Sequence, residues 1–333
     1  MASKRLALVV CISCVCFWLL PSETLIAQTK PPVPAPEKVI IDTDIGDDVD
    51  DAFAVGLAFA SNEVKIIGFT SAWGDTPLRS QMLDRLLCAT GRSDIPVATG
   101  IITESKTSFS QSAWAKAGIE RQHPDAVTFL LDQVKKNPGQ ITLVSIAPLT
   151  NIGAAIDQDA QTFSKLKRVV VMGGSIRKGY DTRASAGPDP QYNIYSDISA
   201  ARKLFLSGVP IYLMPLDSTI IPLGEVMREQ LFTASTPLTD ALTLLYQQWS
   251  QSYRLVTPTL FDAVPVAYVI RPELCPTTPL FISVDNKRYT REASGPANVQ
   301  ACLRSDTQQF LQFYMSRLLT QRPAGTEECR RKY

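Results

Sequence analysis

Short apolar runs alternate with amphipathic segments along most of the chain. Runs with the length and composition of buried strands cover residues 39–41, 64–69, 141–146, 169–172 and 209–214. Segments with apolar residues at helical spacing cover residues 52–60, 78–89, 126–134, 149–156, 199–206 and 306–319. Strands that alternate with helices indicate a mainly parallel sheet covered on both faces. The sequence therefore predicts an α/β fold with a mainly parallel, Rossmann-like open central sheet flanked by helices.

Polar residues gather directly after the predicted strands. Several aspartates between Asp42 and Asp51 follow the first strand, Trp73 to Asp75 follow the second, and Asp217 follows the last. Ligands of open parallel sheets bind outside the carboxyl ends of the strands, because the strand-to-helix loops open on that side. We expect the functional site at this edge of the sheet.

The first of these loops is unusually acidic. It holds six aspartates in ten residues, namely Asp42, Asp44, Asp47, Asp48, Asp50 and Asp51. One or two aspartates would fit a helix N-terminus, where they cap the first turn and meet the positive end of the helix dipole. A larger group of like charges repels strongly, and a cation with hard oxygen ligands is the usual way to make such a density tolerable. The segment therefore predicts a divalent-metal site.

Two other acidic patterns fit this segment less well. An EF-hand loop is a poor match, because a strand precedes the segment and its glycine, Gly46, stands at the fifth position counted from Asp42. Asp42 and Asp44 after a strand are also typical of aspartyl-phosphate hydrolases, in which the first Asp is a nucleophile. Gly46 then occupies a place where that class has Thr or Val, and the later aspartates have no role. A metal-dependent phosphohydrolase stays open as an alternative.

The N-terminal residues form a separate region. Lys4 and Arg5 precede an apolar run over residues 6–20, followed by polar residues and Ala27, which is the pattern of a signal peptide. We expect a signal peptide over residues 1–28, a Pro-rich linker over 29–37 and one domain over 38–333, in a chain exported to the periplasm or the extracellular space. The mature chain keeps an even number of cysteines, which permits disulfides but assigns no pairing: Cys88, Cys275, Cys302 and Cys329.

The overall charge is nearly balanced. The 333 residues include 33 Lys plus Arg and 32 Asp plus Glu. Nothing in this balance draws the protein to nucleic acid or to an anionic membrane. We expect a small-molecule substrate, no nucleic-acid partner, and no membrane contact once the signal peptide is removed.

Five blocks in order resemble the signature of the nucleoside hydrolases of the inosine-uridine preferring type. They are residues 39–52, 147–151, 171–174, 191–194, and Asp262 with the apolar residues after it. The resemblance spans about residues 38–270 and implies the open-sheet fold of that family, in an exported, bacterial-like member. It implies a Ca²⁺-dependent hydrolase that cleaves the N-glycosidic bond of ribonucleosides or related N-ribosides, giving ribose and free base. It also implies a homo-oligomer, a dimer or a tetramer.

The same resemblance assigns roles to single residues. It implies that Ca²⁺ is held by Asp44, Asp51, the carbonyl of Ile146 and Asp262, and that Asp44 is also the general base. It implies a sugar site formed by Asp50, Asp75, Gln191 and Asn193. Cleavage of a ribosyl C–N bond passes through an oxocarbenium-like state. Carboxylates stabilise the positive charge of that state, and a metal lowers the pKa of the attacking water.

Some positions depart from the family pattern. Gln191 stands where many relatives have Glu, so it keeps a hydrogen bond to ribose without a charge, and Ser185 stands near the place of a sugar-binding Asn. Phe261 replaces the His that often precedes the late Asp in purine-preferring members. Protonation of the leaving group would then fall to water, a carboxylate or a tyrosine, with three candidates: Tyr180, Tyr192 and Tyr253. An exported ribose- or nucleoside-binding protein with little turnover is therefore the second hypothesis.

Overall fold

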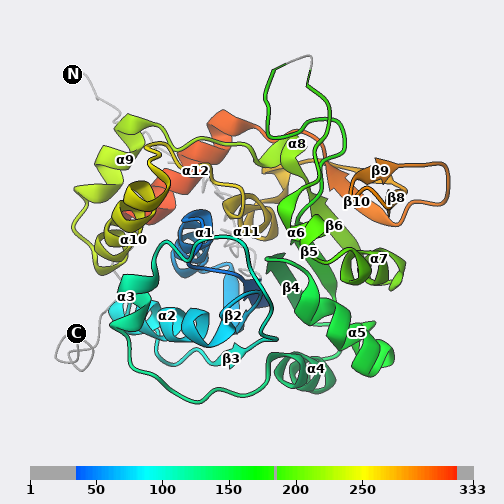
Figure 1. Ribbon diagram of the computed structural model, residues 1–333, viewed down its shortest axis with the longest axis horizontal. Helices are drawn as coiled ribbons and strands as arrows, with labels where there is room; N and C mark the ends of the chain where they lie inside the picture. The colour runs from blue at the N-terminus through cyan, green and yellow to red at the C-terminus, as the bar shows by residue number, and fades with distance from the viewer. Residues whose placement is uncertain (1–34, 184–185, 321–333) are drawn as a thin grey trace, which may run out of the picture. The chain divides into compact units, whose positions relative to one another are not determined.

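The computed structural model describes residues 35–183 and 186–320. Within these residues, eight strands form the main sheet, in the order β3-β2-β1-β4-β5-β6-β10-β7 (Figure 1). Their bounds are β1 (Glu37–Thr43), β2 (Val64–Ser71), β3 (Val97–Thr99), β4 (Ile141–Ile146), β5 (Arg168–Met172), β6 (Ile211–Met214), β7 (Thr277–Leu280) and β10 (Val299–Cys302). Neighbouring strands are parallel except that β7 runs antiparallel to β10. The prediction of a mainly parallel open sheet is confirmed.

The strands contribute to two hydrophobic cores, one on each face of the sheet. Successive side chains of a strand point to opposite faces, so Val39 and Ile41 of β1 enter one core and Ile40 enters the other. In β4, Ile146 belongs to the first core and Leu143 to the second. Burial on both faces explains why these strands are continuous apolar runs without polar alternation.

Helices cover both faces of the sheet. Those that pack on the first core are α1 (Asp50–Phe59), α2 (Thr76–Ala89), α9 (Glu225–Phe232), α10 (Pro237–Tyr253), α11 (Ala263–Ile270) and α12 (Thr307–Thr320). Those on the second core are α4 (Ala126–Lys136), α5 (Thr150–Phe163) and α7 (Ile198–Leu206). In Figure 1, α4, α5 and α7 lie together at the lower right, and α1, α10 and α12 lie at the upper left. Among the described helices, none is both long and apolar enough to cross a membrane.

The strand order creates a crevice between β1 and β4. From β1 the chain winds to β2 and β3 on one side, and then returns to β4 on the other side. Thr43 at the end of β1 lies opposite Ile146 at the end of β4. Loops that leave two such strands diverge, so a ligand crevice forms outside their carboxyl ends. The acidic loop and the loop after Ile146 both open into it.

The structure adds details at both ends of the domain. β1 begins at Glu37, inside the predicted linker, whereas the predicted signal peptide over residues 1–28 lies outside the described residues. The sequence did not predict β7, β10 or the hairpin of β8 (Ile282–Val284) and β9 (Thr290–Glu292). A disulfide joins Cys275 to Cys302 with a Cα–Cα distance of 5.6 Å, and Cys88 is also disulfide-bonded. The helix expected over residues 306–319 is α12.

Candidate active site

A cavity of about 220 Å³ opens in the crevice beside β1 and β4. Its walls come from the acidic loop, the ends of β4 and β5, and the segments that precede α6 (Tyr192–Ser196) and α11. The lining residues are Asp44, Asp47, Asp48, Asp50, Asp51, Thr107, Ile146, Met172, Tyr180, Gln191, Tyr192, Asn193, Tyr253, Phe261 and Asp262. The lining includes every residue that was predicted from the sequence to bind the metal, to act as general base or to bind the sugar, except Asp75.

Three carboxylates meet at one point of the lining. Asp50 and Asp51 form the first turn of α1, where the helix dipole favours negative charge, and Asp262 immediately precedes α11. One oxygen atom of each carboxylate lies within 4.8 Å of the other two, and all three residues are buried. None of them forms an ion pair with a residue that the structure describes. We call Asp50, Asp51 and Asp262 the acidic triad.

Burial makes the charged forms of these groups unfavourable. It raises the pKa of Asp50, Asp51 and Asp262 well above the usual range, and repulsion from neighbouring aspartates of the cavity raises it further. Asp50 and Asp51 also add to the rise at Asp262 through charge repulsion. A divalent cation bound by these oxygens would neutralise the repulsion. The residues present therefore fit a hard metal ion.

The ligands implied by the family resemblance lie around the triad. Asp44, Asp51, Asp262 and Ile146 all line the cavity. Thr43 donates from its hydroxyl to one oxygen of Asp51 at 2.5 Å, which fixes the orientation of that carboxylate. The compact group, however, includes Asp50, which the resemblance assigned to the sugar, and leaves out Asp44. Asp50 therefore lies at the metal cluster as well as at the cavity wall.

The first aspartate of the acidic segment has a different environment. Asp42 accepts hydrogen bonds from the Thr70 hydroxyl at 2.5 Å and from the Asn151 amide at 2.9 Å. Burial raises its pKa to about 6, although these two hydrogen bonds oppose the shift. Asp42 is not part of the cavity lining. This placement disfavours the phosphohydrolase hypothesis, which needs Asp42 as an accessible nucleophile.

A buried arginine of α2, Arg79, binds the acidic loop. The guanidinium of Arg79 forms an ion pair with Asp47 at 3.0 Å and donates to the backbone carbonyls of Asp44 and Ile45. Burial alone would lower the pKa of Arg79, but the charges of Asp47 and Asp44 raise it. Sequence reasoning missed this residue, because a single Arg in a helical pattern is typical of a solvated helix face.

The polar wall opposite the acidic loop is held by its own hydrogen bonds. The Gln191 side chain accepts from the backbone N–H of Gly174 at 3.0 Å and caps the N-terminus of α6 through Ile194. The Asn193 amide donates to the Met172 carbonyl at 3.1 Å. Gln191 thus stabilises the backbone of the wall in addition to lining the cavity. Ser185 lies outside the described residues.

Asp75 is not at the site. Its carboxylate is the N-cap of α2 and accepts a hydrogen bond from the Leu78 backbone N–H at 3.1 Å, and the residue is exposed. Asp75 therefore does not lie in the cavity with the other residues predicted to bind the sugar. An aspartate just before a helix has a local partner in the first turn, and this competes with a ligand role. Nearby Trp73 donates from its indole N–H to the Tyr192 hydroxyl at 2.9 Å.

The outer part of the cavity is aromatic. Tyr180, Tyr192, Tyr253 and Phe261 all line it, and the ring of Phe261 packs edge-on against Tyr180 at 6.1 Å between centroids. Burial raises the pKa of Tyr180 and of Tyr253 to about 12. Their hydroxyls therefore stay protonated at neutral pH and are weak acids, and that of Tyr253 donates a hydrogen bond to the Ser108 carbonyl.

The family model of the inosine-uridine preferring nucleoside hydrolases matches residues 39–312. The chain belongs to this family. Members of the nucleoside hydrolase family are N-glycosyl hydrolases that act on ribonucleosides, and their activity depends on a metal. In this chain, the acidic triad offers three carboxylate oxygens that could hold a metal ion.

Two relatives show how far the similarity extends. A probable uridine nucleosidase 2 from Oryza sativa subsp. japonica is 35% identical over 202 residues, which cover 56% of this chain and 58% of the relative. The chain thus spans less than two thirds of that relative. The pyrimidine-specific ribonucleoside hydrolase RihA of Escherichia coli is 28% identical over 274 residues, which cover 76% of this chain and 86% of the relative.

Solved structures of nucleoside hydrolases share the fold. A plant nucleoside hydrolase, PpNRh1, superimposes with a TM-score of 0.74 at 25% identity, covering 86% of this chain and 100% of that chain. The inosine-uridine preferring nucleoside hydrolase from Bacillus anthracis gives a TM-score of 0.69 at 20% identity, covering 85% of this chain and 99% of that one. The α/β architecture of this chain is therefore that of the family.

Proposed function

We propose that this chain is an exported, Ca²⁺-dependent hydrolase that cleaves the N-glycosidic bond of ribonucleosides to give ribose and free base. The observation that supports it most strongly is the acidic triad at the carboxyl end of β1, buried and without an ion-pair partner in the described part of the chain. A sugar-binding protein without turnover has no need for such a group, because a neutral ribose requires hydrogen bonds and no concentrated negative charge.

The proposed metal ligands are Asp44, Asp51, Asp262 and the carbonyl of Ile146, with Asp50 beside them. Oxygen donors of this kind suit Ca²⁺, which accepts six to eight ligands at flexible angles. When bound, the cation lowers the pKa of water and anchors vicinal hydroxyls. Asp44 lines the cavity from the loop after β1 and is the proposed base that accepts a proton from water.

The proposed sugar site lies between the acidic loop and the wall of Gln191 and Asn193. Positive charge builds on the ribose ring as the C–N bond breaks. Preorganised carboxylates beside the ring stabilise that charge without reorganising during the reaction. Asp50, whose position is fixed in the first turn of α1, is well placed for this role as well as for holding ribose hydroxyls.

The aromatic part of the cavity is the proposed binding site of the nucleobase. Tyr180 keeps its proton at neutral pH and offers a hydroxyl donor to a polar leaving group, whereas the Tyr253 hydroxyl donates to the Ser108 carbonyl at 3.3 Å. The names of two relatives, a probable uridine nucleosidase and a pyrimidine-specific hydrolase, support pyrimidine ribonucleosides as the first substrates to test. We propose export because the leader has a signal-peptide pattern and because the Cys275–Cys302 disulfide suits an oxidising compartment.

The test is turnover of uridine, cytidine, inosine and nicotinamide riboside by the purified mature chain. We expect release of free base with Ca²⁺ and its loss in excess chelator. Asp51→Asn should lower kcat/KM by more than about 100-fold, beyond what changes outside the ligand shell usually cause. Asp157→Asn, at an exposed ion pair with Lys203, is the matched control and should change nothing. Tight ribose binding without turnover of any riboside would instead support the binding-protein hypothesis.

A further inference from the structure

Arg79 is a buried cation that contacts the acidic loop. It belongs to α2, is 1% exposed, and reaches loop residues more than 30 positions earlier in the chain. We propose that Arg79 is a positioning residue of the metal site, which fixes the backbone of the loop so that Asp44 faces the cavity. This inference rests on the proposed Ca²⁺-dependent function.

The guanidinium group of Arg79 binds four acceptors, three of which belong to the acidic loop. Nε donates to the carbonyl of Trp73 at 2.7 Å, and Nη1 donates to the carbonyls of Asp44 and Ile45, the latter at 2.9 Å. Nη2 forms the ion pair with Asp47. Only Arg offers this number of donors in a planar, rigid fork. The Asp44 carbonyl is therefore held toward α2, while the Asp44 side chain lines the cavity.

Packing above the guanidinium reinforces this geometry. The Phe109 ring lies over Arg79, with 4.9 Å between the guanidinium carbon and the ring centroid. The same ring covers Gly46, where a Cβ would stand 2.0 Å from a ring atom and where φ is +126°. The loop is thus held between Arg79 and Phe109, and glycine is required at its turn.

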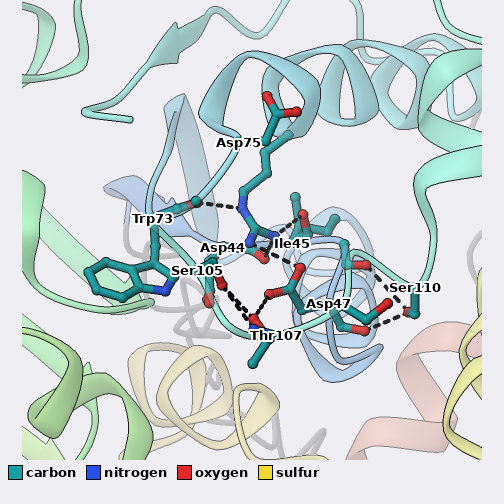
Figure 2. A network of polar contacts seen from close by, with 12 residues as sticks. Asp44, Ile45, Asp47, Trp73, Asp75, Ser105, Thr107 and Ser110 are labelled. Atoms are coloured by element: carbon teal, nitrogen blue, oxygen red, sulfur yellow. Dashed lines mark hydrogen bonds and ion pairs between the residues drawn. The ribbon is translucent and has the colours of Figure 1, made fainter. Parts of the chain in front are cut away.

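The ion pair also determines which aspartates remain for the metal. The Asp47 carboxylate is bound by Arg79 and also accepts from the Thr107 hydroxyl (Figure 2). Asp47 thus has its own cationic partner and is not a member of the acidic triad, although it lies only three residues before Asp50 in the chain. Without Arg79, Asp47 would be a buried, unpaired carboxylate and would compete with the triad for a cation.

Whether replacing Arg79 weakens or strengthens Ca²⁺ binding distinguishes a positioning role from a purely electrostatic one. If Arg79 acted only through its positive charge, its removal would strengthen the attraction of the site for Ca²⁺. If it positions the loop, its removal weakens Ca²⁺ binding although the net negative charge increases. Residues that orient metal ligands typically contribute about 10- to 100-fold to metal affinity.

The experiment measures the Kd of Ca²⁺ for the metal-free mature chain by calorimetry, together with the Tm of each variant. We expect Arg79→Met and Arg79→Lys to weaken Ca²⁺ binding by about 10- to 100-fold. The lysine variant keeps the charge beside Asp47 but loses the fork, so it carries the test if the methionine variant does not fold. The control is Arg228→Met, since Arg228 is also buried and donates to the Leu223 carbonyl at 2.6 Å, outside the cavity lining.

The proposal predicts that Arg228→Met lowers the Tm but leaves the Kd of Ca²⁺ unchanged. Binding by Arg79→Met as tight as wild type, or tighter, would overturn it while leaving the proposed function intact. Equal weakening in Arg228→Met would also overturn it, because the effect would then follow from general destabilisation. A wild-type chain that binds no Ca²⁺ would instead overturn the proposed function and this inference together.

Discussion

At the scale of single residues, the six aspartates of the acidic segment have at least three environments. Asp50 and Asp51 belong to the acidic triad, Asp47 is paired with Arg79, and Asp42 joins β1 to β2 and α5 by hydrogen bonds. Aspartates that are equivalent in composition are thus separated by the partners that the fold brings to each one. Their substitution should therefore have different effects.

Replacing Asp42 tests its structural role. Asp42→Ala should destabilise the protein by about 1–3 kcal/mol, because buried donors from Thr70 and Asn151 would lose their acceptor. Asp42→Asn keeps an acceptor oxygen and should cost much less. Urea denaturation of the metal-free chain measures both values, and turnover of a riboside by Asp42→Asn should stay within a few-fold of wild type. Complete loss of turnover in Asp42→Asn would revive a nucleophilic role for this residue.

The sequence located the acidic site but could not divide the work among its residues. The density of aspartates between Asp42 and Asp51 is a local signal that needs no fold to be seen. The pairing of Asp47 with Arg79, in contrast, depends on how α2 packs beside the loop, and no local pattern in the sequence encodes it. The contact between Gln191 and the backbone of Gly174 was hidden for the same reason, since the two residues are 17 positions apart.

At the scale of secondary structure elements, α2 begins at Asp75, which caps the helix and was predicted to face the sugar. Asp75→Ala should destabilise the protein by about 1 kcal/mol, because the Leu78 N–H loses its side-chain acceptor. Asp75→Asn keeps the cap and should be nearly neutral. The KM for a riboside should be unchanged in both variants, as steady-state kinetics would show. A tenfold higher KM in Asp75→Asn would mean that Asp75 contacts the sugar after all.

The elements themselves were predictable where they are locally regular. Strands buried on both faces, such as β4, appear in the sequence as continuous apolar runs, and α12 appears as an amphipathic pattern. β7 was missed because it is short and contains Pro279, which is tolerated only because β7 lies at the edge of the sheet. Its partner β10 pairs with it across 18 or more intervening residues, and such a partner is not visible in a local pattern.

At the scale of the whole molecule, stability should depend on pH and metal together. Burial raises the pKa of Asp44, Asp50, Asp51 and Asp262 in the folded chain. Between the ordinary pKa of Asp and these raised values, the folded state binds more protons than the unfolded state, so stability falls as pH rises. The metal-free chain should therefore show a higher Tm at pH 5.5 than at pH 7.5.

Ca²⁺ should oppose this dependence of the Tm on pH. Binding requires ionised carboxylates, so Ca²⁺ competes with protons and binds more tightly at the higher pH. A ligand that binds only the folded state adds about 2.7 kcal/mol of stability at a concentration 100 times its Kd. The increase in Tm on adding Ca²⁺ should therefore be larger at pH 7.5 than at pH 5.5, as differential scanning calorimetry can measure. Asp262→Asn removes a charge from the triad and should reduce both the pH dependence and the effect of Ca²⁺. If the metal-free Tm instead rose from pH 5.5 to 7.5, the triad carboxylates would have to be stabilised in their ionised form by the protein alone.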